Sequence, residues 1–148
     1  MSVACPPETL TLILRLKLFD GLNAAELTEL LSLAEMIECD KDDTIIQEGE
    51  QGNHLFVLLA GHARISKRSV GIHKVIQTLG PGECFGEMSL IECRSRSASV
   101  KAMNHCKLLR VEGAHIAQLP NISARLYRNI AILLSHRLRH ANEVLALG

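Results

Sequence analysis

The residues best suited to chemistry lie in one segment in the second half of the chain, where Gly86 and Glu87 are followed by Arg96. Glycine lets the backbone approach a ligand closely. If a short helix starts here, at residues 85–91, its first N–H groups lack internal partners and carry partial positive charge. Arg96 precedes a β-prone run and brings a planar fork that donates two parallel hydrogen bonds. These groups together predict a site for a small anion.

The elements before this segment begin with helices. Apolar residues at helical spacing predict N-terminal helices within residues 8–38, the first of them an amphipathic helix over Leu10–Phe19. Asn23 and Glu26 fit a capping box at the start of the second helix, because each side chain can bond to the other residue's backbone N–H. We expect this second helix to end near Glu38.

The middle of the chain, over residues 40–112, changes to strand-like patterning. Short β-prone runs are separated by turns that contain glycine. The runs are Thr44–Gln47, Leu55–Leu59, Ala63–Ser66, Lys74–Gln77, Ala98–Ala102 and Lys107–Val111. Strands at intervals of about ten residues with turns between them predict an antiparallel roll or barrel.

The tail, over residues 113–146, returns to helix. Pro120 and Asn121 are good starting residues, and apolar side chains follow at helical spacing as far as Leu145. This helix is expected to run for ~25 residues, against an average of ~11–12. Its apolar stripe is wider than one small domain needs, which favours packing on a partner such as a second copy in a two-fold dimer. The sequence therefore predicts one α+β domain over 1–148, an antiparallel, jelly-roll-like β-roll flanked by helices.

The pattern of the anion segment is similar to that of a known family. Phe85–Leu90 followed by Arg96–Val100 resembles the phosphate-binding cassette of the cyclic-nucleotide-binding domains. That family includes the bacterial catabolite activator protein, the regulatory subunits of protein kinase A and cyclic-nucleotide-gated channels. The resemblance covers roughly residues 10 to 146. It includes turn glycines at 49, 52, 61, 80 and 82.

The resemblance implies a cyclic nucleotide as the ligand, cAMP or cGMP, and no other cofactor. It places the cassette at residues 82–100, with a short phosphate-binding helix inside it. Arg96 would pair with the exocyclic phosphate oxygens, and Glu87 would accept the ribose 2′-hydroxyl. Backbone amides of Gly86, Met88 and Ser89 would lie near the phosphate and sugar. Without the family resemblance, a surface ion pair worth ~0–1 kcal/mol would be the favoured interpretation of Glu87 and Arg96.

Four further residues are assigned to the ligand by the resemblance. Val75 and Ile76 would form an apolar wall beside the base. Ser97 would contact the phosphate or the base, although a strand-edge hydrogen bond accounts for it equally well. Asn142 would reach the ligand from the tail helix, or is an ordinary solvated helix residue. In this family the tail helix lies against the base, so its movement would carry the signal.

Two enzyme classes compete with this non-catalytic interpretation. A cupin-type metalloenzyme needs a His-x-His pair with a Glu and a further His, but His62 is followed two residues later by Arg64. Nucleophilic catalysis by Cys84 or Cys93 would need an arranged base, and the sequence shows none. Neither class is favoured.

A metal site on the tail helix is a further alternative. His136 and His140 are four residues apart and could share one face of the helix. A metal there would need at least a third ligand, and the sequence offers none nearby. No metal is therefore expected.

Composition bounds the remaining possibilities. Sixteen basic and sixteen acidic residues cancel, so no basic face for nucleic acid is expected. Five cysteines without paired spacing are typical of reduced thiols in a cytoplasmic protein. Leu10–Phe19 is too short and too charged to span a membrane. The sequence ends at Gly148, directly after the long helix, which is consistent with a stand-alone sensor or with the effector part of a Crp-type transcription regulator without its DNA-binding part.

Overall fold

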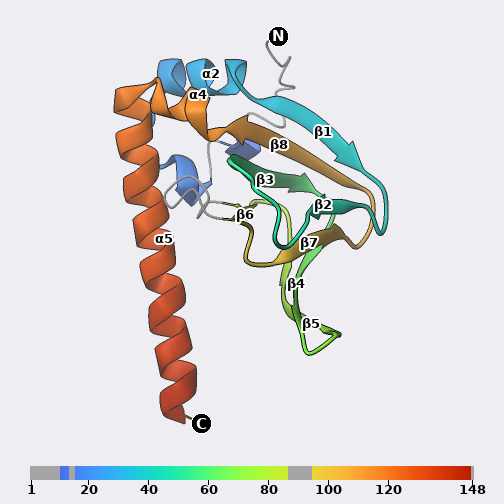
Figure 1. Cartoon of the computed structure of the whole chain (residues 1–148). Coiled ribbons are helices and arrows are strands. Elements are labelled where there is room, and N and C mark those ends of the chain that lie inside the picture. The colour runs from blue at the N-terminus through green and yellow to red at the C-terminus, as the bar shows by residue number, and fades with distance from the viewer. Residues whose placement is uncertain (1–10, 14–15, 87–94, 148) are drawn as a thin grey trace.

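The computed structural model of the chain describes residues 11–13, 16–86 and 95–147 (Figure 1). Helices lie toward both ends of the chain and strands occupy its middle. The elements in chain order are η1 (Lys17–Phe19), α2 (Ala24–Ser32), β1 (Glu35–Cys39), β2 (Thr44–Ile46), β3 (His54–Ala60), β4 (Ala63–Ser69), β5 (Ile72–Leu79), β6 (Cys84–Phe85), β7 (Ser99–Ala102), β8 (Cys106–Glu112), α4 (Gly113–Ala117) and α5 (Pro120–Leu147).

Within the described ranges the strands form two antiparallel sheets of four strands each. The first sheet has the order β1-β8-β3-β6, and the second has the order β2-β7-β4-β5. In the first sheet Phe56 of β3 lies opposite Arg110 of β8 on one side and Phe85 of β6 on the other. The predicted antiparallel roll is confirmed.

Buried side chains from both sheets meet inside the roll. This inner core consists of Ile46, Phe56, Leu58, Ala63, Leu79, Phe85, Val100, Ala102, Cys106 and Leu108. Successive side chains of a strand point to opposite faces, so each of these strands sends alternate residues inward. The inner core therefore holds the two sheets together.

A second, outer core lies between the first sheet and the helices. Leu55 and Val57 of β3 and Leu109 of β8 point outward from the roll and pack in one cluster with Leu27 of α2 and Leu126 of α5. Because both faces of the first sheet are covered, Leu55–Leu58 form an unbroken run of buried residues rather than an alternating one.

The start of the roll differs from the prediction. The capping box of α2 is confirmed, with the Asn23 side chain accepting from the Glu26 N–H at 2.8 Å. However, the helix ends at Ser32 instead of near Glu38, and residues 35–39 form β1. This segment pairs with β8 along its whole length, from Glu35 opposite Arg110 to Cys39 opposite Cys106. Tertiary pairing has overridden the local helical pattern.

The expected helix over Leu10–Phe19 is confirmed at residues 11–13, but it does not continue to Phe19. Leu16 has an extended backbone, with φ −74° and ψ 131°, and the chain then enters the short 3₁₀ turn η1. Leu16, Leu18 and Phe19 are all buried in the outer core. The extended backbone at Leu16 thus ends the first helical segment, and the next residues reach the outer core from η1.

The tail helix is confirmed, and it is longer than expected. α5 has 28 residues and extends well past the roll (Figure 1). Ile122, Leu126 and Ile130 are buried against the rest of the domain, whereas every residue from 135 to 145 is exposed. None of the helices described here is long and apolar enough to cross a membrane.

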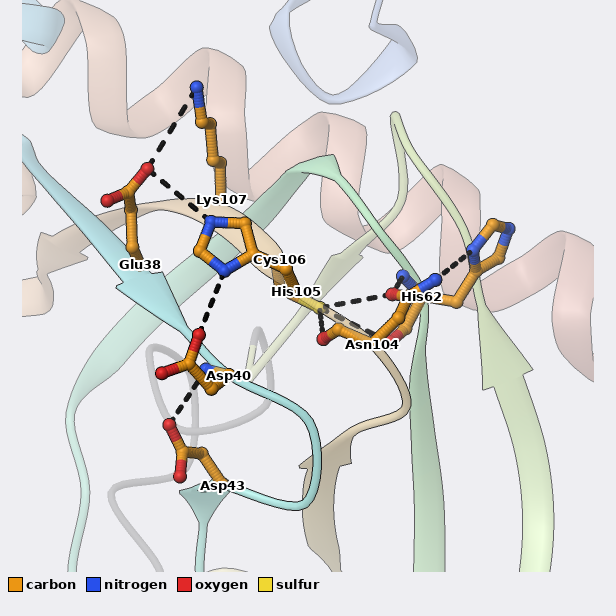
Figure 2. Close-up of polar contacts among 8 residues, drawn as sticks. All are labelled: Glu38, Asp40, Asp43, His62, Asn104, His105, Cys106 and Lys107. Carbon is orange, nitrogen blue, oxygen red and sulfur yellow. Dashed lines mark hydrogen bonds and ion pairs between the residues drawn. The ribbon is translucent and has the colours of Figure 1, made fainter.

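Polar contacts join two turns at the edge of the first sheet, as Figure 2 shows. His105 lies between two carboxylates, with its Nδ1 3.1 Å from Asp40 Oδ1 and its Nε2 3.6 Å from Glu38 Oε1. Lys107 Nζ lies 3.9 Å from the same Glu38 oxygen. These contacts raise the pKa of His105 above its usual value, mainly through the hydrogen bond to Asp40. The turn after β1 and the turn before β8 are therefore linked through one imidazole.

The neighbouring thiol is structural in character. Cys106 is buried, and its Sγ donates to the His62 carbonyl at 3.2 Å (Figure 2). Burial raises the pKa of Cys106 and also that of Cys39, which lies opposite it across the β1–β8 ladder. Raised pKa values leave little thiolate at neutral pH, so both side chains act as apolar packing groups.

Candidate functional site

The main chain of Arg96 is fixed to the loop between β2 and β3. Its N–H donates to the Glu50 carbonyl at 2.8 Å, and its carbonyl accepts from the Gly49 N–H at 2.8 Å. The preceding residue, Ser95, forms a β-bridge with Gln51. Because these contacts are backbone to backbone, they position Arg96 independently of the side chains in the loop.

The Arg96 guanidinium lies between β3 and the end of β6. Nη2 donates to the His54 carbonyl at 3.1 Å, and Nη1 reaches the Gly86 carbonyl at 3.4 Å. The side chain is partly buried. One carbonyl from β3 and one from the residue after β6 therefore fix the orientation of the planar fork and hold it against the turn at Gly86.

Two glycines leave the space in which this guanidinium lies. A Cβ added to Gly52 would stand 2.3 Å from Arg96 Nε. Gly86 has φ +79°, and a Cβ there would stand 2.7 Å from the His54 carbonyl oxygen and 3.0 Å from Arg96 Nη1. A side chain at either position would collide with the arginine or with the carbonyl that orients it, and at Gly86 it would also strain the backbone.

An aromatic pair supports this arrangement from inside the roll. Phe56 of β3 and Phe85 of β6 are stacked with ring centroids 5.2 Å apart and an interplanar angle of 5°. The two residues also face each other in the strand ladder. Since Gly86 directly follows Phe85, this pairing brings the Gly86 turn against β3, where Arg96 meets it.

The side chain of His54, whose carbonyl contacts the Arg96 guanidinium, has a lowered pKa. Burial lowers the pKa of His54, and the nearby positive charges of Arg110 and Arg96 lower it further. The lowered pKa favours the uncharged form of the His54 ring. Arg110 itself forms an ion pair with Glu35, whose pKa is lowered by that contact.

The structure brings together two of the predicted site residues, Gly86 and Arg96. Ser97 follows Arg96 in a bend just before β7. Glu87, Met88 and Ser89 lie outside the described residues. Their assignments, like that of Ser97, remain predictions.

The predicted apolar wall and tail contact are exposed to solvent. Val75 and Ile76 of β5 are 52% and 58% exposed. Asn142 lies in the exposed C-terminal half of α5. To bury a ligand, β5 or α5 would have to contact it through these exposed residues. The roles of Val75, Ile76 and Asn142 therefore also remain predictions.

Two parts of the site were not predicted. The sequence marks Gly52 as a turn glycine, but its collision with Arg96 depends on a contact across 44 positions of the chain. The His54 carbonyl is a backbone group, and no side-chain pattern identifies it. The one sequence signal for either part was the glycine at position 52, which lies outside the cassette.

The metal and nucleophile alternatives gain no support from the part of the chain that the structure describes. No group of three or more His, Cys, Asp or Glu side chains in these residues could hold a metal ion. His62 contacts Asn104 beside β8, and Cys84 is buried in the outer core. Cys93 lies outside the described residues.

Taken together, the fold and this site define a β-roll domain in which two glycines make room for an oriented arginine side chain. A family model for the cyclic nucleotide-binding domain matches residues 36–122. The match covers more than half of the chain, so the chain belongs to the cyclic nucleotide-binding domain family. It is thus a regulatory ligand-binding domain by family.

The relatives include prokaryotic and eukaryotic regulators. The cyclic AMP receptor protein of Thermus thermophilus is 34% identical over 135 residues, which are 88% of this chain and 61% of that protein. The human cGMP-dependent protein kinase 2 is 37% identical over 87 residues, 57% of this chain and 11% of the kinase. The chain therefore spans about three fifths of the length of the bacterial relative and a small part of the kinase.

Solved structures of cyclic-nucleotide-binding proteins have the same fold as this chain. The crystal structure of the Thermus thermophilus catabolite activator protein superimposes with a TM-score of 0.78 at 32% identity, covering 88% of this chain and 62% of that one. A cyclic nucleotide-binding domain from Methylobacillus flagellatus superimposes with a TM-score of 0.81 at 24% identity, covering 95% of this chain and 83% of that one. The second likeness concerns the fold alone.

Proposed function

We propose that this chain is a non-catalytic sensor of a cyclic nucleotide, cAMP or cGMP, that acts in the cytoplasm. The observation that carries the proposal is the position of Arg96 within the family's domain. Its guanidinium lies against the left-handed turn at Gly86 and is oriented by the carbonyls of His54 and Gly86. A charged fork oriented in this way favours a phosphate monoanion.

In this proposal the residues of the cassette divide the ligand between them. Arg96 pairs with the exocyclic phosphate oxygens, and backbone amides of Gly86, Met88 and Ser89 add further donors. Glu87 accepts the ribose 2′-hydroxyl, and Ser97 reaches the phosphate or the base. Each charge-assisted hydrogen bond contributes ~1.5–3 kcal/mol net. Glu87 thereby selects a ribonucleotide over its 2′-deoxy analogue.

The signal in this proposal is a movement of α5. The exposed half of this helix closes over the base with Asn142 on the ligand side, while Val75 and Ile76 form the opposite wall. Ligand binding shifts the helix only if the helix contacts the ligand more strongly in one position than in the other. The solvent exposure of these three residues is consistent with an open position of the helix.

Calorimetry with Arg96→Ala tests the site. The variant should lose ~2–5 kcal/mol of binding free energy for the preferred nucleotide, because one partner of a desolvated charge pair is removed. Arg96→Lys should also bind weakly, because lysine keeps the charge but not the planar fork. Lys41→Ala is the control, since Lys41 is exposed in the turn between β1 and β2 and outside the site. An Arg96→Ala affinity within about threefold of the wild-type value, a difference below ~1 kcal/mol, would refute the assignment.

A thermal-shift panel with cAMP, cGMP and cyclic di-GMP identifies the base. A ligand at 100 times its Kd adds ~2.7 kcal/mol to the free energy of unfolding, which raises the melting temperature visibly. The proposal expects cAMP or cGMP to give the largest rise. If no nucleotide in the panel raises it, the sensor proposal fails.

A second candidate function is that of the effector domain of a Crp-type transcription regulator. It is favoured by the 34% identity to the Thermus thermophilus cyclic AMP receptor protein, of which this chain spans 61%. Fusion of the chain to a helix-turn-helix domain tests this role. DNA binding by the fusion should depend on the cyclic nucleotide, and nucleotide-independent binding would count against it.

A further inference from the structure

A groove lined by positive charge lies where α5 meets η1. It has a volume of about 310 Å³. Its lining residues are Lys17, Asp20, Gly21, Arg125, Arg128, Asn129, Ile132, Leu133 and His136. None of them belongs to the proposed nucleotide site, so the groove is a separate feature of the fold.

The positive charges of the groove are not used inside the described part of the domain. Lys17, Arg125 and Arg128 make no ion pair with any described residue. Asp20 is the one carboxylate among the lining residues. Three permanent cations against one carboxylate leave an excess of positive charge facing a single hollow, which favours an anion.

The groove is also held in shape before any ligand arrives. The buried Asn129 side chain donates to the Leu18 carbonyl at 2.7 Å and to the Asp20 carbonyl at 2.9 Å, which ties α5 to the turn after η1. Gly21 has φ +84°, and a Cβ there would stand 2.8 Å from Arg125 Cζ. The turn therefore lies directly against the Arg125 guanidinium and limits its freedom.

Apolar surface completes the lining. Ile132 is 41% exposed although it lies close to the packed part of α5, and Leu133 beside it is only partly buried. Small-molecule sites combine such apolar surface with a few placed polar groups, in hollows of about 300–1,000 Å³. The volume of this groove is at the lower end of that range and fits a small ligand.

We propose that the groove between η1 and α5 binds a small organic anion, a phosphate or carboxylate carried on an apolar body. Arg125, Arg128 and Lys17 bind the anionic group, and Ile132 and Leu133 contact the apolar part. The site is independent of Arg96 and goes beyond the proposed nucleotide sensing. Because its walls come from both η1 and α5, a bound anion bridges the tail helix and the N-terminal turn.

Titration of the full chain with phenyl phosphate, followed by amide chemical shifts in NMR, tests the proposal. Phenyl phosphate should shift the resonances of Lys17, Gly21 and Asn129 in a saturable way. Benzyl alcohol, which lacks the charge, and benzylamine, which carries the opposite charge, should not. No saturable shift at these residues with phenyl phosphate overturns the proposal.

Variants then separate a built site from general attraction. The double variant Lys17→Gln, Arg128→Gln should weaken phenyl phosphate binding at least ~tenfold, because two charge-assisted contacts are lost. Arg139→Gln removes one exposed charge elsewhere on α5 and should leave the affinity within ~twofold. Equal weakening by Arg139→Gln would mean that the helix attracts anions without a site.

Two further measurements separate this groove from the nucleotide site and from a surface for an acidic protein. Arg96→Ala should leave the shifts at Lys17, Gly21 and Asn129 unchanged, so failure of the nucleotide proposal does not affect this one. Loss of these shifts in Arg96→Ala would assign them to the nucleotide site and overturn the proposal. Binding of a polyglutamate peptide without binding of phenyl phosphate would overturn it as well, in favour of an acidic protein partner.

Discussion

At the scale of single residues, Arg96 is placed by backbone groups. Its own N–H and carbonyl are bonded to Glu50 and Gly49, and its fork is bonded to the carbonyls of His54 and Gly86. Backbone carbonyls fix the direction of a guanidinium while the guanidinium keeps its permanent charge. The steric freedom needed for this position comes from Gly52 and Gly86.

Gly52→Ala should therefore weaken nucleotide binding without unfolding the domain. The new Cβ would collide with the far end of the Arg96 side chain, which can move away, so the fold survives while the fork is displaced. We expect a loss of affinity of about tenfold or more, since a charge-assisted contact is misaligned. Calorimetry measures the affinity, and thermal melting without ligand measures the stability.

Gly80→Ala is the matched control for this change. A Cβ there meets only His62 at 3.7 and 3.8 Å, which is ordinary van der Waals contact. It should bind nucleotide as the wild type does. If Gly52→Ala binds equally well, then the position of the Arg96 fork does not matter for the ligand.

His105 gives the fold a pH dependence that can be measured. Its folded pKa is raised by Asp40 and Glu38, so the charged imidazole is more stable in the folded state than in the unfolded one. This stabilisation is fully present below the unfolded pKa of about 6.5 and is lost as the pH rises through the higher folded value. Its size is limited because the side chain is 54% exposed and solvent screens the pairs.

His105→Gln should thus lower the free energy of unfolding at acidic pH and have a smaller effect above neutrality. Urea unfolding at a series of pH values measures the difference from the wild type, and added salt should reduce it. His140→Gln is the control, because His140 is exposed on α5 and makes no ion pair with a described residue. A difference that stays constant with pH would show that His105 contributes through packing alone.

At the scale of elements, α5 has two halves with different environments. Ile122, Leu126 and Ile130 bury the first half against η1, α4 and the first sheet. Beyond residue 134 the helix has no buried position in the described chain. The first half therefore belongs to the core, whereas the second half is exposed to solvent.

Asn129 fixes the packed half of α5 to the turn after η1. Asn129→Ala leaves the carbonyls of Leu18 and Asp20 without their donor, and an unsatisfied buried polar group costs ~1–3 kcal/mol. We expect a loss of that size in the free energy of unfolding, measured with urea. Asn142→Ala on the exposed half of the same helix should change it by less than ~0.5 kcal/mol. Equal effects of the two changes would mean that the Asn129 hydrogen bonds do not hold the packed half in place.

At the scale of the whole molecule, the first sheet is shared by two cores, whereas the tail of α5 belongs to neither. Leu138, Val144 and Leu145 are 63%, 54% and 77% exposed on this tail. Apolar residues exposed along one helix are a common basis for two-fold pairing. We therefore propose that two copies of the chain associate through the tail.

The double variant Leu138→Glu, Leu145→Glu should abolish this association, because the carboxylates would be buried between the helices. Sedimentation of the wild type should show a dimer and that of the variant a monomer. Arg139→Glu changes the charge of the same exposed segment and removes no apolar side chain, so it should remain a dimer. A wild type that sediments as a monomer at all concentrations contradicts the pairing.

The fold could be predicted from the sequence wherever a local pattern matched its tertiary environment. The capping box at Asn23, six of the eight described strands and the long helix from Pro120 were predicted correctly, whereas β1 and β6 were not. Two errors, the helix extended to Glu38 and the continuation of the first helix to Phe19, share one cause. In both places long-range packing decided the backbone, on β8 in one case and in the outer core in the other.

The candidate site was likewise predicted where local properties decide and not where long-range contacts decide. The residue types and spacing at Gly86 and Arg96 determined by themselves that an anion is the expected ligand, because charge and backbone freedom are local properties of the chain. Only the tertiary structure decided where the guanidinium lies, since its partners at Gly52 and His54 come from a distant loop and strand. The groove at η1 likewise depends on residues more than a hundred positions apart, whose proximity no local pattern encodes.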